Sequence, residues 1–543
     1  MPSASVWMAA VSAPAPTLPD PASREDQTSS DLRIPDRVGR IPLWVLAGGA
    51  LVLAMAVSAF LRTRYMSGEF WIDEGLSVGI STHSLASIPT VLRHDGSPPL
   101  YYLMLHVWMN VFGNSEAATH AMSLLFGLLT IPVGAWVAWS LFGRWPAFVA
   151  LVLFALNPFL TAYSQETRMY SLMALLGLLA TAGLIHGFVY RRRRYLILFA
   201  IAQSLMLYTH AWGIFYGIGA GVAFLFVVAA SDEPRALWRD GLLAFGAAAV
   251  LYLPWLPTLL YQASHTGSPW DNAPNFGAPV QISRNLMGGD RATIALVLAT
   301  VLGLALLFSR SRWRSRESLT MWTLILIPVG TLAFGWIVSQ FSPAWAYRYF
   351  APILGSLLLL AALGMSRAKG VGLIALALVV VFWANPSKFT PHYKSDMRDI
   401  AGEVGPMLHR GDLVVVGQPE SVPLSWYYLP AGLRFADTSG PAPDPQSMNW
   451  VNALSRLQHA DPRTTLDRLI ATLKRNQQVL FVRPLTEGAQ NWQAPWTELV
   501  RRRSAQWGAL LASDPNLKAV AWAPHNYRGA CCVADSALLY RKS

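Results

Sequence analysis

The chain has 543 residues, of which 53% are apolar and 13% are charged, and its formal net charge is +12. That charged fraction is about half the share usual for a soluble globular protein, which argues against that class and predicts a polytopic helical membrane protein. The positive charge does not indicate nucleic-acid binding, because the arginines cluster in short loops between apolar runs, as cytosolic anchors do. The adjacent Cys531 and Cys532 offer no disulfide framework, so we expect two unpaired thiols.

The first 36 residues are rich in Pro, Ser, Asp and Ala, and we expect a disordered cytosolic tail. This tail is too polar for a secretory signal. The apolar run that follows, 41–61, lacks an obvious small-residue cleavage site and is long enough to span a bilayer. It is therefore expected to remain as the first membrane span.

Further apolar runs of roughly 17–25 residues, the length that crosses a bilayer, recur along the chain. The stretch 195–230 is about twice that length, and the polar break at Tyr208-Thr209-His210 divides it into two spans. About eleven spans are predicted: 41–61, 118–142, 146–163, 169–190, two within 195–230, 242–260, 291–309, 319–340, 347–366 and 370–384.

One further apolar run, 98–113, decides the topology. Two basic clusters, Arg191–Arg194 and Arg310–Arg316, should face the cytosol, as should Arg37–Arg40 before the first span. All three do so only if 98–113 does not cross, and the run is short and begins with Pro-Pro. We therefore predict that 98–113 is a helix lying in the outer interface, within a first outer loop at 62–117.

This topology places the amino terminus in the cytosol and the residues after about 385 outside. In that segment, 413–417, 478–484, 518–524 and 537–543 have strand patterns, and 463–475 and 496–512 are helical in pattern. The predicted domains are the tail 1–36, a membrane domain at 37–384 and an extracytoplasmic α/β domain at 385–543. The Ala-, Leu- and Arg-rich composition suggests a bacterial plasma (inner) membrane.

Polar groups gather at the outer ends of the predicted spans, on five separate segments. They are Asp73 and Glu74 in GEFWIDEGLS, Asp95 in HDGSPPLYY, Gln165, Glu166 and Arg168 in YSQETRMYS, Tyr208 and His210 in YTHAWG, and Tyr347 and Arg348 in AYRYFAP. Convergence on one face of the membrane is what a catalytic pocket at that surface requires.

Each position also has a plainer explanation. The Asp73–Glu74 pair could be a solvated loop or a helix cap, and Glu166 could form a structural bridge with Arg168. His210 could be a packing histidine, and Arg348 could reach toward lipid headgroups. The catalytic interpretation rests on chemistry: an arginine and a histidine can hold a phosphate, and a nearby carboxylate can take a proton from an attacking hydroxyl. Phosphate in the headgroup plane implies a lipid phosphate.

Several motifs carry a family resemblance over roughly 65–366, and the segments YKSDMRDIA and GDLVVVGQPE extend it weakly into the tail. The main motifs are WIDEGLS, DGSPPLYYLMLHVW, FGNSEAATHAMSLLFGLLTIP, SLFGRW, NPFLTAYSQETRMYSL, YTHAWG and RYFAPIL. In these motifs the sequence resembles the GT-C superfamily of membrane glycosyltransferases, in the branch with protein O-mannosyltransferases and the lipid A aminoarabinose transferase.

The resemblance implies an inverting transfer of a sugar from a polyprenyl phosphate, outside the cytosol. It assigns the catalytic base to Asp73, a positioning or metal-contacting role to Glu74, and a second acidic site to Glu166 beside Gln165. The phosphate-holding groups fall on His210 and Arg348. Arg168, Tyr208, Tyr347 and Asp95 join the expected substrate-binding set. No cofactor is required, but members differ in metal dependence, so a divalent metal, held by Asp73 and Glu166, is left open.

The sequence departs from the family at Ser97, where several relatives carry a lysine before Pro-Pro-Leu, so donor-headgroup recognition need not follow theirs. Mannose or a pentose is the expected sugar, and a glycan, a glycolipid or a protein the expected acceptor. The main rival function is a transporter or flippase of lipid-linked sugars, whose polar residues would lie at the membrane midplane on broken helices. A non-catalytic scaffold would leave the Asp73–Glu74 pair and SQETR unexplained.

Overall fold

A computed structural model describes residues 37–38, 41–309, 314–384, 394–485, 493–523 and 535–543. The expectations for the tail 1–36 and for the two cysteines lie outside these residues. The chain divides into two compact units, Met1–Ala50 and Leu51–Ser543. In the first, β1 (Arg37–Val38) pairs antiparallel with β2 (Ile41–Pro42), after which α2 (Leu43–Thr63) begins.

Seven helical stretches in the described residues are long and apolar enough to cross a membrane. They are Trp44–Thr63 of α2, α6 (Glu116–Phe142), α9 (Tyr170–Leu184) continued by η1 (Ile185–Val189), α12 (Pro234–Tyr252) with η2 (Leu253–Trp255) and α13 (Leu256–His265), α15 (Asp290–Phe308), α16 (Arg316–Ser339), and η3 (Tyr347–Ile353) with α17 (Leu354–Arg367).

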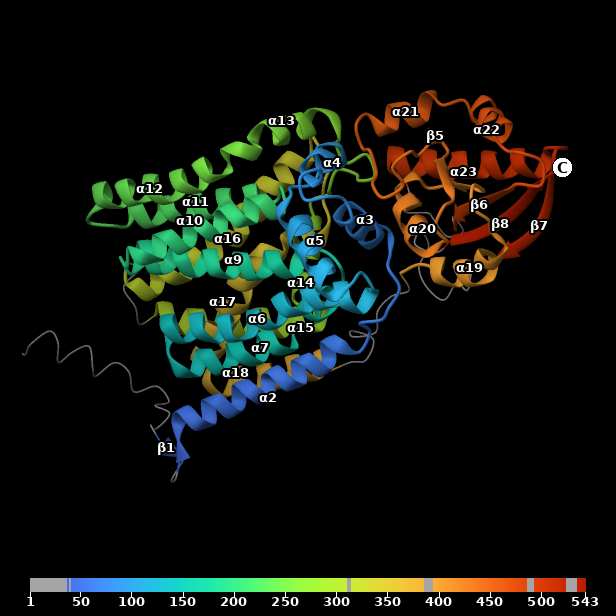
Figure 1. Ribbon diagram of the computed structural model, residues 1–543. Helices are drawn as coiled ribbons and strands as arrows, with labels where there is room; N and C mark the ends of the chain where they lie inside the picture. The colour runs from blue at the N-terminus through green and yellow to red at the C-terminus, as the bar shows by residue number, and fades with distance from the viewer. Residues whose placement is uncertain (1–36, 39–40, 310–313, 385–393, 486–492, 524–534) are drawn as a thin grey trace, which may run out of the picture. The chain divides into compact units, whose positions relative to one another are not determined.

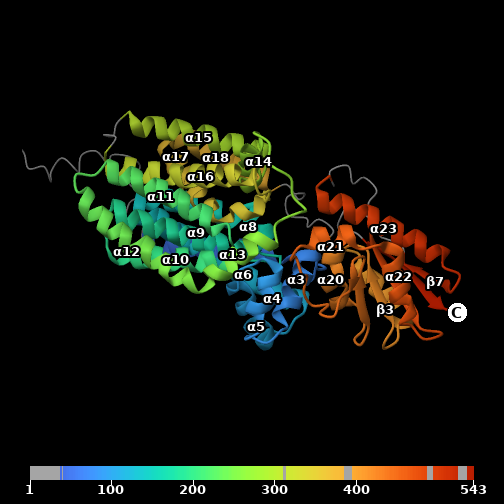
Figure 2. The same cartoon turned by 90° about the horizontal axis from the view of Figure 1, so that it is seen from above.

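Shorter apolar helices account for the remaining predicted spans. These are α7 (Arg144–Leu156), followed by α8 (Pro158–Tyr163), α10 (Arg194–Thr209), α11 (Gly213–Ala229) and α18 (Lys369–Trp383). Every one of the apolar runs predicted to span the membrane is therefore helical. Figures 1 and 2 show α15, α17 and α18 running side by side in this multi-pass membrane domain.

Burial separates central helices from lipid-facing ones. In the apolar windows of α9 with η1 and of η3 with α17, 94% and 83% of the residues are buried, against 6% in α2. Gly177 of α9 allows η3 to approach, because a Cβ there would lie 2.2 Å from the carbonyl oxygen of Pro352. This contact fixes the start of η3, and with it Arg348, against the central helix.

The first outer loop folds as three helices: α3 (Ile72–Ser81), α4 (Ile88–Asp95) and α5 (Leu100–Phe112). At its 13 residues, α5 is about 20 Å long, well short of a bilayer core of about 30 Å. That length agrees with the interfacial helix expected at 98–113, although its place in the membrane stays a prediction. A further short helix, α14 (Ala278–Leu286), precedes α15.

The C-terminal segment contains a six-stranded sheet in the order β5-β4-β3-β6-β8-β7. Strand β3 (Leu413–Val416) pairs parallel with β4 (Arg434–Asp437) and β6 (Gln478–Pro484), whereas β8 (Asp535–Lys542) pairs antiparallel with β6 and β7 (Leu517–Ala523). The short β5 (Gly440–Pro441) closes one edge. The strand predictions are thus confirmed in type and place, whereas the domain boundary near 385 stays a prediction.

Helices cover both faces of this sheet (Figure 1). Apolar residues of α22 (Pro462–Ala471) and α23 (Pro495–Ser513) pack on one face, and both helices fall in the ranges predicted to be helical. Apolar residues of α19 (Met397–Val404) and α20 (Val422–Tyr428) pack on the other face. Three further short helices lie in the described part of the segment: η5 (Gly405–Met407), η6 (Pro419–Ser421) and α21 (Ala453–His459).

The core on the α19–α20 face also contains Phe70 and Val78 from the first outer loop. Helix α3 lies very close to the C-terminal domain: a Cβ on Gly75 would be 2.7 Å from Cα of Leu424, and one on Gly79 would be 2.1 Å from the carbonyl oxygen of Gln446. Because only glycine permits such approach, α3 is packed as an element of the C-terminal domain as well as of the membrane domain.

Candidate active site

The centre of the site is a carboxylate between two arginines. Asp73 lies in the first turn of α3, where the helix dipole favours a negative charge. Its Oδ2 accepts a hydrogen bond from Arg348 Nη2 at 3.4 Å and lies 3.9 Å from Arg168 Nη2. The side chains of Asp73 and Arg348 are 24% and 22% exposed, so solvent or a substrate can reach the pair. The structure therefore brings together three of the predicted residues from three separate segments.

Aromatic groups hold Arg348 in place. Its Nε donates to the hydroxyl of Tyr170 at 3.0 Å, and its guanidinium lies 5.2 Å from the ring centre of Trp71 and 5.5 Å from that of Tyr349. Such cation–π contacts orient the guanidinium plane. Tyr347 is 41% exposed, and its ring packs near Phe159 and Tyr163.

Arg168 is buried, and it donates hydrogen bonds mainly to residues of α3. Its Nη1 donates to the backbone oxygen of Asp73 at 3.3 Å, to Ser77 Oγ at 3.0 Å and to the hydroxyl of Tyr102 at 3.4 Å. Asp95, at the end of α4, is 7% exposed and lies near both Asp73 and Arg168. Burial raises the pKa of Asp95 to about 6, although Ser97 and Arg168 act against that rise.

Glu74 is fully buried and fully engaged. Its carboxylate contacts Lys394 Nζ at 2.9 and 3.1 Å and His120 Nε2 at 2.6 Å, and it accepts from the amides of Thr167 and Trp71. Burial would raise the pKa of Glu74, but Lys394 and His120 outweigh it and hold that pKa at about 2. Both oxygens of Glu74 are engaged in this way, and these contacts fit the positioning role that the resemblance implies, which stays a prediction.

Gln165 belongs to the same buried network. Its Oε1 accepts from the amide of Tyr65, its Nε2 donates to Thr161 O, and its own carbonyl oxygen accepts from Lys394 Nζ at 2.9 Å. These contacts tie the loop after α8 to Lys394 of the C-terminal segment. Gln165 is thus part of the buried network, and the substrate contact expected for it stays a prediction.

Glu166 differs from its neighbours, because its buried Oε1 has no hydrogen-bond partner among the described residues. Burial and the nearby Glu74 raise the pKa of Glu166 to about 7, although Lys394 and Arg348 act in the opposite direction. The carboxyl group therefore titrates near neutral pH and can both donate and accept a hydrogen bond there.

His210 reaches the site and Tyr208 does not. The ring of His210 lies 4.9 Å from that of Tyr349, and its Nδ1 accepts from the amide of Trp212 at 3.2 Å, which leaves the proton on Nε2. Burial, followed by Arg168 and Arg348, lowers the pKa of His210 to about 3, so the ring is neutral at pH 7. The hydroxyl of Tyr208 instead donates to the backbone oxygen of Leu251, away from this group of residues.

The predicted site residues that the structure describes are not grouped as metal ligands. Within the described ranges, no group of three or more His, Cys, Asp or Glu side chains is placed to hold a metal ion. Asp73, one of the two carboxylates expected to hold a metal if one binds, already pairs with Arg348. The donor set fits an anionic substrate beside the arginines better than it fits a cation.

Sequence reasoning missed three members of the site: Lys394, His120 and Tyr170. Both Lys394 and His120 lie in motifs that carry the family resemblance, YKSDMRDIA and FGNSEAATHAM, but nothing local marks either side chain as a partner of Glu74. Tyr170 directly follows the SQETRM segment, and its hydroxyl could not be assigned to Arg348 without the packing of η3 on α9.

Comparison with solved structures finds the same fold in membrane glycosyltransferases. ArnT from Cupriavidus metallidurans matches in its apo state with a TM-score of 0.57 and 15% identity, covering 91% of this chain and 98% of that one. The ArnT structure bound to undecaprenyl phosphate matches with a TM-score of 0.56 at the same identity and coverage.

The apo oligosaccharyltransferase of Archaeoglobus fulgidus matches with a TM-score of 0.53 and 12% identity, over 84% of this chain and 72% of that one. No protein-family model and no curated protein sequence matches the chain. The membrane helices and the C-terminal α/β segment together therefore have the fold of GT-C membrane glycosyltransferases.

Proposed function

We propose that this protein is an inverting glycosyltransferase that moves mannose or a pentose from a polyprenyl phosphate to an acceptor hydroxyl. The observation that carries the proposal is the accessible Asp73 carboxylate, 3.4 Å from Arg348 Nη2 at the start of an outer helix. The GT-C fold supports it, and one of the similar structures, ArnT, has been solved with undecaprenyl phosphate bound.

In this mechanism, Arg348 binds the donor phosphate through its planar guanidinium, and the neutral His210 donates one hydrogen bond from Nε2. Asp73 takes the proton from the acceptor hydroxyl. The hydroxyl oxygen then attacks the anomeric carbon from the face opposite the phosphate, so the bond to the phosphate oxygen breaks and the configuration inverts. Arg348 stabilises the charge that accumulates on the departing polyprenyl phosphate.

The remaining charged residues have supporting roles in this proposal. Arg168 fixes α3 through the backbone oxygen of Asp73, and Glu74 anchors the same turn through Lys394 and His120. Asp95 and Glu166 carry the raised pKa values, about 6 and about 7. Both can therefore exchange hydrogen bonds with the hydroxyls of the donor sugar or of the acceptor at neutral pH.

We also propose that the site faces the outside of the plasma membrane, with the amino terminus in the cytosol. Support comes from α10, which begins at Arg194 beside the basic cluster and ends at Thr209 beside His210. Its 16 residues separate the two ends by about 24 Å, most of the thickness of a bilayer core. Basic residues prefer the cytosolic side, so the opposite end, with the site, faces outward.

The decisive experiment compares Asp73→Asn with Asp73→Glu in proteoliposomes that contain a radiolabelled polyprenyl-phosphate sugar. Removing a general base costs about 10²–10⁴ in rate, so Asp73→Asn should transfer almost no label, whereas Asp73→Glu should keep a measurable fraction. Thermal unfolding of both variants should match that of the wild type. Full transfer by Asp73→Asn would refute the assignment, and movement of the labelled lipid across the bilayer without transfer would identify a flippase.

A further inference from the structure

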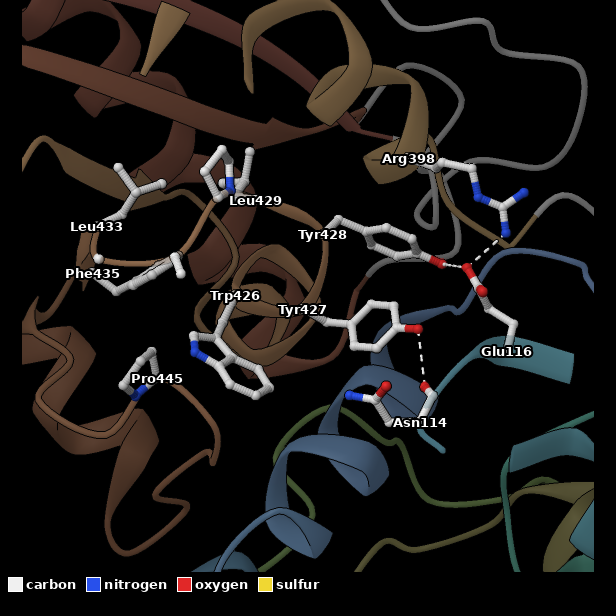
Figure 3. A pocket seen from close by; sticks show the side chains of 13 residues that line it. Asn114, Glu116, Arg398, Trp426, Tyr427, Tyr428, Leu429, Leu433, Phe435 and Pro445 are labelled. Atoms are coloured by element: carbon white, nitrogen blue, oxygen red, sulfur yellow. Dashed lines mark hydrogen bonds and ion pairs between the residues drawn. The ribbon is translucent and has the colours of Figure 1, made fainter. Parts of the chain in front are cut away.

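A pocket lies outside the catalytic group, between the 62–117 segment and the C-terminal domain. Its volume is about 640 Å³, within the range of small-molecule sites. The loop between α5 and α6 contributes Asn114, the first turn of α6 contributes Glu116, α19 contributes Arg398, and α20 contributes Trp426, Tyr427 and Tyr428. Figure 3 shows these side chains around the pocket. None of them takes part in the mechanism above.

The aromatic wall of this pocket is held rigidly. The hydroxyl of Tyr427 donates to the backbone oxygen of Asn114 at 3.0 Å, and its ring lies 4.8 Å from the rings of both Phe70 and Tyr428. The hydroxyl of Tyr428 accepts from the amide of Phe70 at 2.8 Å and donates to Glu116 Oε1 at 2.9 Å. Trp426, half-buried, lies next to these rings (Figure 3).

The polar wall of the pocket is the ion pair between Glu116 and Arg398, which has hydrogen-bonding groups left for a ligand. Arg398 Nη2 donates to Glu116 Oε1 at 2.6 Å and to Ser67 O at 3.0 Å. A guanidinium has five N–H donors and a carboxylate about four acceptor positions, so this pair offers further donors and acceptors in one plane. The Arg398 side chain is 44% exposed, so those donors are accessible.

We propose that this pocket binds a carbohydrate unit of the acceptor, a proposal that rests on the glycosyltransferase function above. A sugar ring presents an apolar C–H face, which stacks on an aromatic ring, and an edge of hydroxyls that both donate and accept. The pocket places Trp426 and Tyr427 beside the Glu116–Arg398 pair, which matches both properties at once.

A peptide suits this pocket less well. Peptides bind to the exposed edge of a sheet, to an apolar groove that takes a helix, or to an aromatic groove that takes a polyproline segment. The strand at this pocket is β4, which contributes Phe435 and is paired on both sides, with β3 and β5. The rest of the wall consists of helix ends and turns.

The pocket is linked directly to the catalytic residue. Phe70, whose amide donates to Tyr428, precedes Asp73 by three residues, a separation of at most about 11 Å along the chain. Helix α20 packs on α3 at Gly75. The pocket wall and Asp73 are therefore held by the same short segment at the start of α3.

The test uses saturation-transfer NMR on the full-length protein in detergent, with mannotetraose, arabinotetraose and a Ser/Thr-rich peptide as probes. At least one tetrasaccharide should receive saturation on its C–H protons, with about tenfold weaker binding in Trp426→Ala, because an aromatic contact is lost. Ala431→Trp, at an exposed position that lines the pocket, should block binding by filling it. Trp522→Ala is the matched control, because Trp522 is 61% exposed on β7, outside the pocket.

The outcomes separate the two proposals. Asp73→Asn should bind the tetrasaccharide as the wild type does, since binding here does not need the catalytic base. Sugar binding without transfer activity in the wild type would overturn the proposed function alone. The pocket assignment fails if no tetrasaccharide binds, if the peptide binds instead, or if Trp426→Ala and Ala431→Trp bind sugar as tightly as Trp522→Ala.

Discussion

Replacing Lys394 with methionine tests the buried link between the C-terminal segment and α3. The change keeps the length of the side chain but removes its charge, its contacts of 2.9 and 3.1 Å with Glu74 and its donation to Gln165 O. Removing one partner of a buried ion pair costs about 3–5 kcal/mol, because the other charge is left without compensation. His120 and two backbone amides still contact Glu74, so we expect the lower end, about 3 kcal/mol.

The loss should depend on pH with a defined sign. Burial raises the pKa of Glu74, but Lys394 and His120 outweigh burial and lower that pKa from 4.5 to about 2, so this stabilisation is complete above pH 4.5 and disappears as the pH falls toward 2. Without Lys394, burial dominates and the pKa of Glu74 rises. The variant then suffers most at neutral pH and recovers in acid, where the carboxyl group becomes protonated.

The measurement is thermal unfolding of the purified protein near pH 7.5 and near pH 5. Lys394→Met should lower Tm by about 3 °C at the higher pH, because unfolding a chain of 543 residues has an entropy of about 1.1 kcal/mol/K, and by less at the lower pH. In the double variant Glu74→Gln/Lys394→Met the loss should be smaller than the sum of the single losses. Lys518→Met, at an exposed position on β7, is the control. An unchanged Tm at both pH values, or additive losses, would refute the reasoning.

Three further predictions concern separate parts of the site. Arg348→Ala should raise KM for the polyprenyl-phosphate donor by about tenfold or more, and Arg348→Lys by less, because lysine keeps the charge but not the planar fork; an unchanged donor KM contradicts the phosphate role. Because burial raises the pKa of Glu166 from 4.5 to about 7, the contribution of Glu166 to stability falls as the pH rises from about 4.5 to about 7 and stays unfavourable above that. Glu166→Gln should therefore raise Tm relative to the wild type near pH 8.5 but not near pH 4.5, and an equal gain at both would count against this. Gly79→Ala places a Cβ 2.1 Å from Gln446 O and should lower both Tm and transfer, whereas Gly246→Ala, with nothing within 4 Å, should change neither; equal behaviour of the two would show that close packing of α3 is dispensable.

Much of the architecture could be predicted from the sequence, because hydrophobic length and periodicity are local signals. The predicted spans are helical, and the strands at 413–416 and 478–484 lie where short apolar runs bounded by turn residues placed them. The meeting of Asp73 with Arg348 also followed, because the membrane restricts polar groups at the ends of spans to one of two faces.

Pairings between distant segments could not be predicted in the same way. Glu74 has the same local sequence context as Asp73, but their helical positions turn one side chain toward solvent and the other toward His120 and Lys394. Tyr208 lies two residues before His210, but Tyr208 is in the last turn of α10, and its side chain points to the backbone oxygen of Leu251. Such outcomes depend on the rotation of a helix about its axis, which flanking residues alone do not determine.

The packing of α3 has a consequence for biosynthesis. The core that holds Phe70 and Val78 includes Ala537 and Leu539 of β8, a strand that lies between β6 and β7. Some of the residues that pack around α3 thus lie more than 400 positions after it in the sequence. They are synthesised only after the membrane spans between them have left the ribosome. Helix α3 can reach its final environment only once β8 has been delivered to the same side of the membrane. Formation of the proposed site is in this way tied to synthesis of β8, and a protein truncated before β8 should insert into the membrane without acquiring a formed site.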